Sequence, residues 1–151
     1  MNLVVVDVAT RVRGWTERFA KRSYFHRDLA GACAWGSAVL HHHLRRVGVS
    51  SKIAYNDGNC FVLVNSHIVD VTATQFVRQQ NHDMYMSQDG VLIVRAAEWK
   101  KYCDSHRVYA GEYWEHERVF VSVDSLIKHL RLMRWPSEQT PVLSKVLDSR
   151  I

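Results

Sequence analysis

The chain has 151 residues and a formal net charge of +5, and 47% of its residues are hydrophobic, 23% charged and 11% aromatic. This length predicts one compact domain over residues 1–151 with a substantial hydrophobic core, and the composition excludes a disordered, collagen-like or linker protein. The basic excess permits an acidic or nucleic-acid partner, although the sequence carries no motif of a known nucleic-acid-binding module.

Two amphipathic helices are predicted in the first third of the chain. The first covers residues 7–21, where apolar side chains recur at helical spacing at Val8, Val12, Trp15 and Phe19. The second covers residues 32–47, with the same repeat at Cys33, Ser37, Leu40, Leu44 and Val47. We expect Asp28 or Gly31 to cap the start of this second helix and Gly48 to end it.

Short β-rich runs follow Gly48. The strands are expected at residues 52–55, 60–64, 67–72, 91–95 and 118–123, and a last helix is expected at 125–133. Asn65-Ser66 separates the second and third strands and suits a tight hairpin. The order of helices, strands and a final helix predicts an α+β fold with an antiparallel sheet.

The hairpin turn also predicts which side chains share a face. Placing Val64 opposite His67 makes Asn59 and Asp70 diagonal neighbours on one face of the two strands. The same alternation turns Cys60 and His67 to the other face, where Cys60 is expected to pack in the core.

Cys33 is the candidate nucleophile. A thiol in the first turn of a helix lies beside unpaired backbone amides at the positive end of the helix dipole, which favour a thiolate and can stabilise an oxyanion. Taken alone, a cysteine on an Ala-rich helix is more often a packing residue. The surrounding pattern therefore decides between the two interpretations.

That pattern resembles a known family. The segment Leu29–Ser37 (LAGACAWGS), the run NCFVLV from Asn59 and the run IVDVTATQF from Ile68 are similar to the transglutaminase-like branch of the papain-like cysteine enzymes, in its small bacterial or phage type. The resemblance covers roughly residues 28 to 76. It implies a papain-like domain with N-terminal helices packed on an antiparallel sheet, in which Cys33 attacks a peptide or protein substrate and Asp70 orients the general base.

Asn59 departs from the family pattern, because the family has its catalytic His at this position. An amide side chain cannot accept a thiol proton near neutral pH, and the loss of one member of such a cooperative unit removes several orders of magnitude in rate. His26, just ahead of the second helix, is one candidate replacement base. His67 is the other, but only if the hairpin register shifts by one residue.

Three functions remain open on this basis. The first is a transglutaminase-like cysteine hydrolase or acyl transferase acting on an amide or ester bond, impaired by the missing His. The second is an inactive papain-like scaffold, for example a phage-encoded inhibitory module, that binds a protein target. The third is a basic nucleic-acid-binding protein, whose affinity would fall steeply with added salt.

The remaining features predict no metal and no cofactor. Consecutive side chains in the run from His41 to His43 fan out around a helix, so we interpret the run as a solvated face, and the three cysteines lack the spacing of a zinc site. No apolar run approaches the length of a membrane span and no secretory signal is recognised, so we expect a cytoplasmic protein. Aromatic residues between positions 99 and 114 could line a ligand groove but more often build a core: Trp99, Tyr102, Tyr109, Tyr113 and Trp114.

Overall fold

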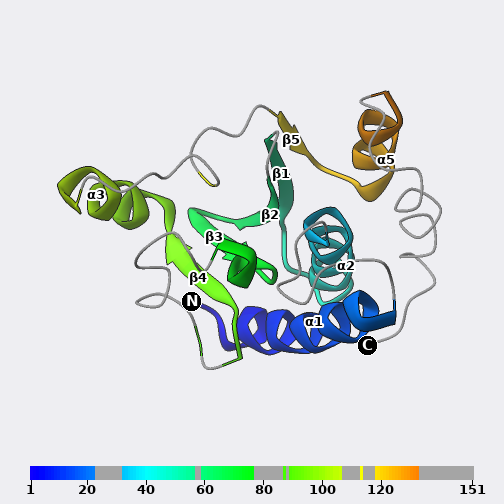
Figure 1. The fold of residues 1–151 in the computed structure, drawn as a ribbon, viewed down its shortest axis with the longest axis horizontal. Coiled ribbons are helices and arrows are strands. Elements are labelled where there is room, and N and C mark those ends of the chain that lie inside the picture. Colours follow the sequence, from blue (N-terminus) through cyan, green and yellow to red (C-terminus); the bar gives the residue numbers. More distant parts are fainter. Residues whose placement is uncertain are drawn as a thin grey trace.

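The structure is a computed structural model that describes residues 1–22, 32–56, 59–76, 87, 89–106, 113 and 118–132. The helices in these ranges are α1 (Leu3–Arg22), α2 (Cys33–Arg46), the short 3-10 helix η1 (Ala73–Phe76), α3 (Ala96–His106) and α5 (Val123–Leu132). The strands are β1 (Lys52–Asn56), β2 (Asn59–Val64), β3 (His67–Asp70), β4 (Leu92–Arg95) and β5 (Arg118–Phe120) (Figure 1).

The five strands form one antiparallel sheet in the order β4-β3-β2-β1-β5. The α+β class predicted from the sequence is therefore confirmed. The hairpin register is also as predicted, since Val64 pairs with His67 and Leu63 with Ile68. Asn65 in the turn has a φ of 54°, a left-handed conformation that Asn tolerates better than most residues.

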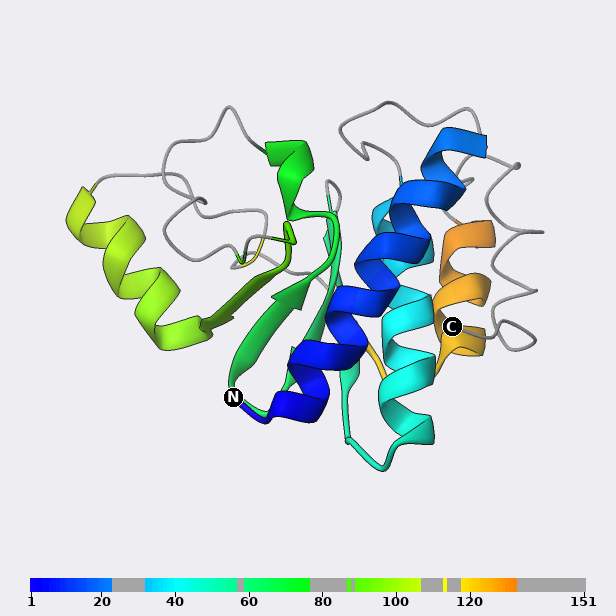
Figure 2. The same ribbon diagram turned by 90° about the horizontal axis from the view of Figure 1, so that it is seen from below.

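Helices cover both faces of the sheet. In Figure 2, α1, α2 and α5 lie on one side of the strands and α3 lies on the other. Two groups of buried side chains correspond to these layers. The first core joins the sheet to α1, α2 and α5 and includes Cys33, Cys60 and Val62, whereas the second joins it to α3 and includes Phe61 and Trp99. This difference between neighbouring residues of β2 follows from the alternation of side chains along a strand.

The predicted helices differ from the observed ones mainly at their ends. The first helix begins at Leu3, four residues earlier than expected, and its first residues remain exposed. The second helix runs from Cys33 to Arg46 after Ala32, which provides no side-chain cap, and both proposed capping residues lie outside the described residues. Gly48 has a φ of 81°, which fits its expected role at the end of this helix.

The segment after β4 forms a helix that the sequence did not predict. Trp99 on α3 is fully buried, and Tyr102 and Tyr113 join it in the second core. The edge-on contact between Trp99 and Tyr113, with ring centroids 5.6 Å apart, belongs to this packing. These three aromatic residues therefore build core, while Tyr109 and Trp114 lie outside the described residues.

The interpretation of the histidine run as a solvated face is wrong. His41 is 1% exposed and His43 is 7% exposed. The physical reason is the central place of α2, which α1, α5 and the sheet cover from several directions, so that His41 and His43 are both buried and His42 is partly buried. His41 accordingly makes a buried hydrogen bond of 2.8 Å between its Nδ1 atom and the Ser51 hydroxyl.

A search of the described helices for a membrane-spanning segment finds none that combines the necessary length with sufficient apolar character.

Candidate active site

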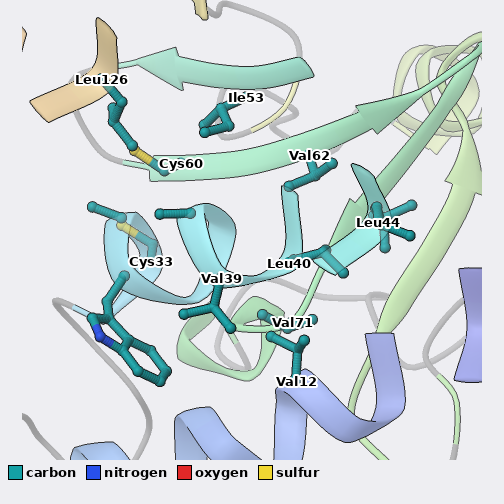
Figure 3. Packing of buried hydrophobic residues seen from close by; sticks show 14 of the residues in the cluster. Val12, Cys33, Val39, Leu40, Leu44, Ile53, Cys60, Val62, Val71 and Leu126 are labelled. Carbon is teal, nitrogen blue, oxygen red and sulfur yellow. The ribbon is translucent and has the colours of Figure 1, made fainter. Parts of the chain in front are cut away.

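Cys33 is the first residue of α2 and packs in the first core, against the sheet (Figure 3). Its sulfur receives hydrogen bonds from the thiol and the backbone amide of Cys60 on β2 and from the backbone amide of Ala34. The Ala34 amide is free to do so because the first turn of a helix leaves its N–H groups without intrahelical partners. The start of α2 and the start of β2 therefore form one cradle around the thiol.

This cradle favours the thiolate form of Cys33. The hydrogen bond from the Cys60 thiol is the largest influence, and it lowers the pKa of Cys33, while burial opposes this effect. The two backbone amides lower the pKa of Cys33 further, and the negative charge of Asp70 raises it. The pKa of Cys60 moves well upward, mainly because its thiol donates to Cys33 and because it is buried. Cys60 is therefore the protonated partner.

Asn59 and Asp70 meet as the hairpin register predicts. The Asn59 side-chain amide donates to Asp70 Oδ2 over 3.3 Å. The same oxygen accepts a hydrogen bond of 2.9 Å from the Tyr113 hydroxyl. Asp70 Oδ1 accepts from the backbone amide and the hydroxyl of Thr72, at 2.7 and 2.9 Å. All four residues are buried, so the carboxyl is enclosed by neutral hydrogen-bond donors.

Burial raises the pKa of Asp70, because the charged carboxylate loses its hydration. The hydrogen bonds from Thr72, Tyr113 and Asn59 act in the opposite direction. The carboxyl is thus held in place by donors that cannot themselves take up or release a proton near neutral pH.

The thiol and the acid–amide pair lie at the same end of β2. Asn59 precedes Cys60, whose thiol and amide hold the Cys33 sulfur, and the charge of Asp70 acts on both thiols. The thiols and the acid–amide pair adjoin different cores, however. Cys33 and Cys60 belong to the first core, whereas Tyr113, which donates to Asp70, packs edge-on against Phe61 in the second core.

Gly36 permits the close approach of α2 to this region. A Cβ at Gly36 would lie 3.0 Å from Val71 and 3.3 Å from Thr16 and Thr72. These distances are shorter than ordinary van der Waals contacts, so the absence of a side chain lets α2 pack tightly between α1 and the end of β3. The first turn of α2, with its thiol, is thereby fixed beside Asp70 and Thr72.

Of the two candidate replacement bases, His67 and His26, the structure describes only His67. The register is not shifted, and His67 pairs with Val64 at the turn of the hairpin, three residues from Asp70 along β3. The groups that perturb the pKa of His67, besides its burial, are the chain's amino terminus, Arg95 and Glu98, so the structure does not bring it to Cys33. His26 lies outside the described residues.

Two members of the cluster were missed by the sequence interpretation. Cys60 was assigned to core packing only, although the alternation that turns it away from Asn59 also turns it toward the helix carrying Cys33. Tyr113 reaches Asp70 from 43 residues away, and no local pattern could indicate that contact.

In the described part of the chain, no three His, Cys, Asp or Glu side chains are gathered in a way that could hold a metal ion. The fold and the cluster thus define an α+β protein with a buried thiol at a helix start beside an acid–amide pair. Comparison with known proteins finds no matching family, no matching curated protein and no matching solved structure.

Proposed function

We propose that the chain is a cysteine-dependent acyl-transfer enzyme of the transglutaminase-like, papain-like type, with Cys33 as the nucleophile. The observation that carries this proposal is the hydrogen-bonded cradle around the Cys33 sulfur at the start of α2. A thiolate stabilised in this way is nucleophilic without a neighbouring imidazole. The Asn59–Asp70 pair supports the proposal as the remnant of the base and acid positions that the resemblance implies.

The proposed reaction begins with attack of the Cys33 thiolate on the carbonyl carbon of an ester or an amide. The negative charge that develops on the carbonyl oxygen would be stabilised by backbone amides at the helix start. Collapse of this tetrahedral species expels the leaving group and forms a thioester on Cys33. Water or another acceptor then takes the acyl group and releases the thiolate.

The groups near the thiol favour a particular kind of leaving group. Asn59 cannot donate a proton as an acid would, and Asp70 is occupied by Asn59, Thr72 and Tyr113. An amine must be protonated to depart, whereas an acidic alcohol or a thiolate departs unaided. We therefore expect activated esters and thioesters to be cleaved faster than amides.

Thiol labelling tests the nucleophile. Each cysteine lies in a separate tryptic fragment (residues 28–45, 53–78 and 102–107), so mass spectrometry resolves the three rates with iodoacetamide. At pH 6 to 7 we expect Cys33 to react at least about tenfold faster than Cys103, because of its lowered pKa. Equal and slow labelling of both cysteines would contradict the proposal.

Restoring the family residue tests the site. Asn59→His is expected to raise hydrolysis of a generic thioester by about tenfold or more, since general base catalysis contributes factors of this size. The double variant that also carries Cys33→Ala should lose the gain. No gain in a folded Asn59→His protein, shown by unchanged circular dichroism, would count against the site.

One observation favours a second candidate function, a protein-binding scaffold. Both carboxyl oxygens of Asp70 accept hydrogen bonds from neutral donors on Asn59, Thr72 and Tyr113. Such bonds stabilise the fold but transfer no proton to or from a substrate. The same two experiments separate the candidates. Slow labelling of Cys33 together with an inert Asn59→His variant is the result that the binding scaffold predicts.

A further inference from the structure

Cys33 and Cys60 form a thiol pair inside the first core. They belong to α2 and β2, elements that pack directly on one another, and the Cys60 thiol donates a hydrogen bond to the Cys33 sulfur. Figure 3 shows Cys33 on α2 and Cys60 on the neighbouring strand β2, next to Leu126. All three cysteines are free, and Cys103 lies in the second core with α3. The pairing therefore involves only two of the three thiols.

The two thiols of the pair are unequal. Cys33 is the first residue of α2, where free backbone amides favour a thiolate, whereas Cys60 lies within β2 and is fully buried. Cys33 is also the thiol whose pKa is lowered, while the pKa of Cys60 is raised. One sulfur is thus suited to attack, and the other holds a proton beside it.

We propose that Cys33 and Cys60 are a redox-active pair in which Cys33 reduces small hydroperoxides and Cys60 resolves the product as an internal disulfide. The proposal is carried by the contact of the two thiols across α2 and β2. It does not rest on the acyl-transfer function, because it needs only the reactivity of the sulfurs.

The chemistry has two steps. The Cys33 thiolate attacks the terminal oxygen of a hydroperoxide, the O–O bond breaks, and the departing alkoxide (hydroxide, for hydrogen peroxide) takes up a proton from solvent. Cys33 becomes a sulfenic acid. The Cys60 sulfur then attacks the sulfenic sulfur, its proton leaves with the hydroxyl group as water, and a disulfide forms. Two thiols are oxidised by two electrons in total, and one hydroperoxide is reduced to an alcohol and water.

The second step joins side chains of α2 and β2, which pack directly on one another in the first core. It also protects Cys33, because a sulfenic acid that meets a thiol at once does not proceed to the irreversible sulfinic acid. Cys103 takes no part, since its side chain packs in the other core.

Peroxide treatment of the reduced full-length chain tests the pair. With about one equivalent of hydrogen peroxide, we expect two thiols to be lost and the tryptic fragments 28–45 and 53–78 to become linked, while fragment 102–107 keeps its free thiol. Dithiothreitol should restore both thiols. A link to Cys103, disulfides only between chains, or oxidation of Cys33 no faster than that of Cys103 would overturn the proposal.

Variants assign the roles. In Cys60→Ser, Cys33 should still be oxidised and should be trapped as a sulfenic acid by dimedone, with no internal link. Cys103→Ser is the matched control and should behave as the wild type. Failure of the two proposals is distinguishable in the wild-type chain, because the internal disulfide is read from linked tryptic fragments and acyl transfer from thioester cleavage by the reduced protein. Internal disulfide formation without thioester cleavage would refute acyl transfer alone.

Discussion

At the scale of single residues, the Asp70 carboxyl organises the site. It accepts hydrogen bonds from Asn59, Tyr113 and both donors of Thr72, which lie on separate segments of the chain. A buried carboxyl without such partners would be strongly unfavourable, so these bonds determine how the end of β3 is packed.

Removing one donor tests this role. Tyr113→Phe keeps the ring packed against Phe61 and Trp99 but removes the hydroxyl that donates to Asp70. We expect the free energy of unfolding to fall by about 1–2 kcal/mol, as is typical when a buried acceptor loses a partner. Urea unfolding followed by circular dichroism measures the change. A loss below about 0.3 kcal/mol would show that the hydroxyl does not stabilise the carboxyl.

At the scale of elements, α2 is packed against α1, α5 and the sheet. Gly36 lets it pack closely against Thr16 of α1 and against Val71 and Thr72 after β3, and its His41 and His43 are buried. Both features can be tested by substitution.

Glycine to alanine substitutions in two helices should have opposite effects. Gly36→Ala places a methyl group 3.0 Å from Val71, and we expect a loss of about 1–3 kcal/mol from overpacking. Gly14→Ala on α1 is the matched control. Its Cβ would meet only Arg18, at 3.6 Å, so better helix propensity should stabilise the protein by about 0.5–1 kcal/mol. Thermal melts of both variants measure the difference, and equal effects would refute the close packing of α2.

The buried histidine His43 predicts destabilisation by acid. Burial lowers its pKa from 6.5 to about 4, so between these values the unfolded state binds the proton more readily than the folded state. The buried neutral form of His43 makes its full contribution to the free energy of unfolding above pH 6.5, and this contribution is lost as the pH falls toward 4. Between pH 7.5 and pH 5 the free energy of unfolding should therefore fall by roughly 1–3 kcal/mol less in His43→Gln than in the wild type. Urea unfolding at pH 7.5 and pH 5 measures this. Parallel pH profiles for variant and wild type would contradict the prediction.

At the scale of the whole molecule, Arg13 joins segments that are far apart in the sequence. Its Nη1 atom donates to the carbonyls of Val71 and Gly90 and to the Thr74 hydroxyl, at 3.0 to 3.1 Å. Gly90, with a φ of 80°, leaves the space that the guanidinium occupies. The side chain thereby ties α1 to the end of β3, to η1 and to the turn before β4.

Two arginines on the same helix provide a matched comparison. Arg13→Met leaves buried carbonyls without their donor, and we expect a loss of roughly 2–4 kcal/mol. Arg11→Met removes only an exposed ion pair with Asp7, and its cost should stay below about 0.5 kcal/mol. Chemical unfolding of both variants tests the contrast. Similar values would show that the buried arginine does not hold the segments together.

The sequence predicted the parts of the fold that depend on short-range patterns. Helical periodicity located α1 and α2, start and stop signals located α5, and the Asn65-Ser66 turn set the β2–β3 register and so the contact of Asn59 with Asp70. It did not predict α3, nor the burial of His41 and His43, because these depend on which elements pack over a helix rather than on its own pattern.

By itself the sequence determined the α+β class, the hairpin register and the placement of the Cys33 thiol at a helix start, because periodicity and turn chemistry act over a few residues. Only the tertiary structure decided that Cys60 would face Cys33, that Tyr113 would donate to Asp70 and that Arg13 would bind Val71. The last two contacts join residues 43 and 58 positions apart, and such pairs are set by how α2, α1 and the sheet pack together.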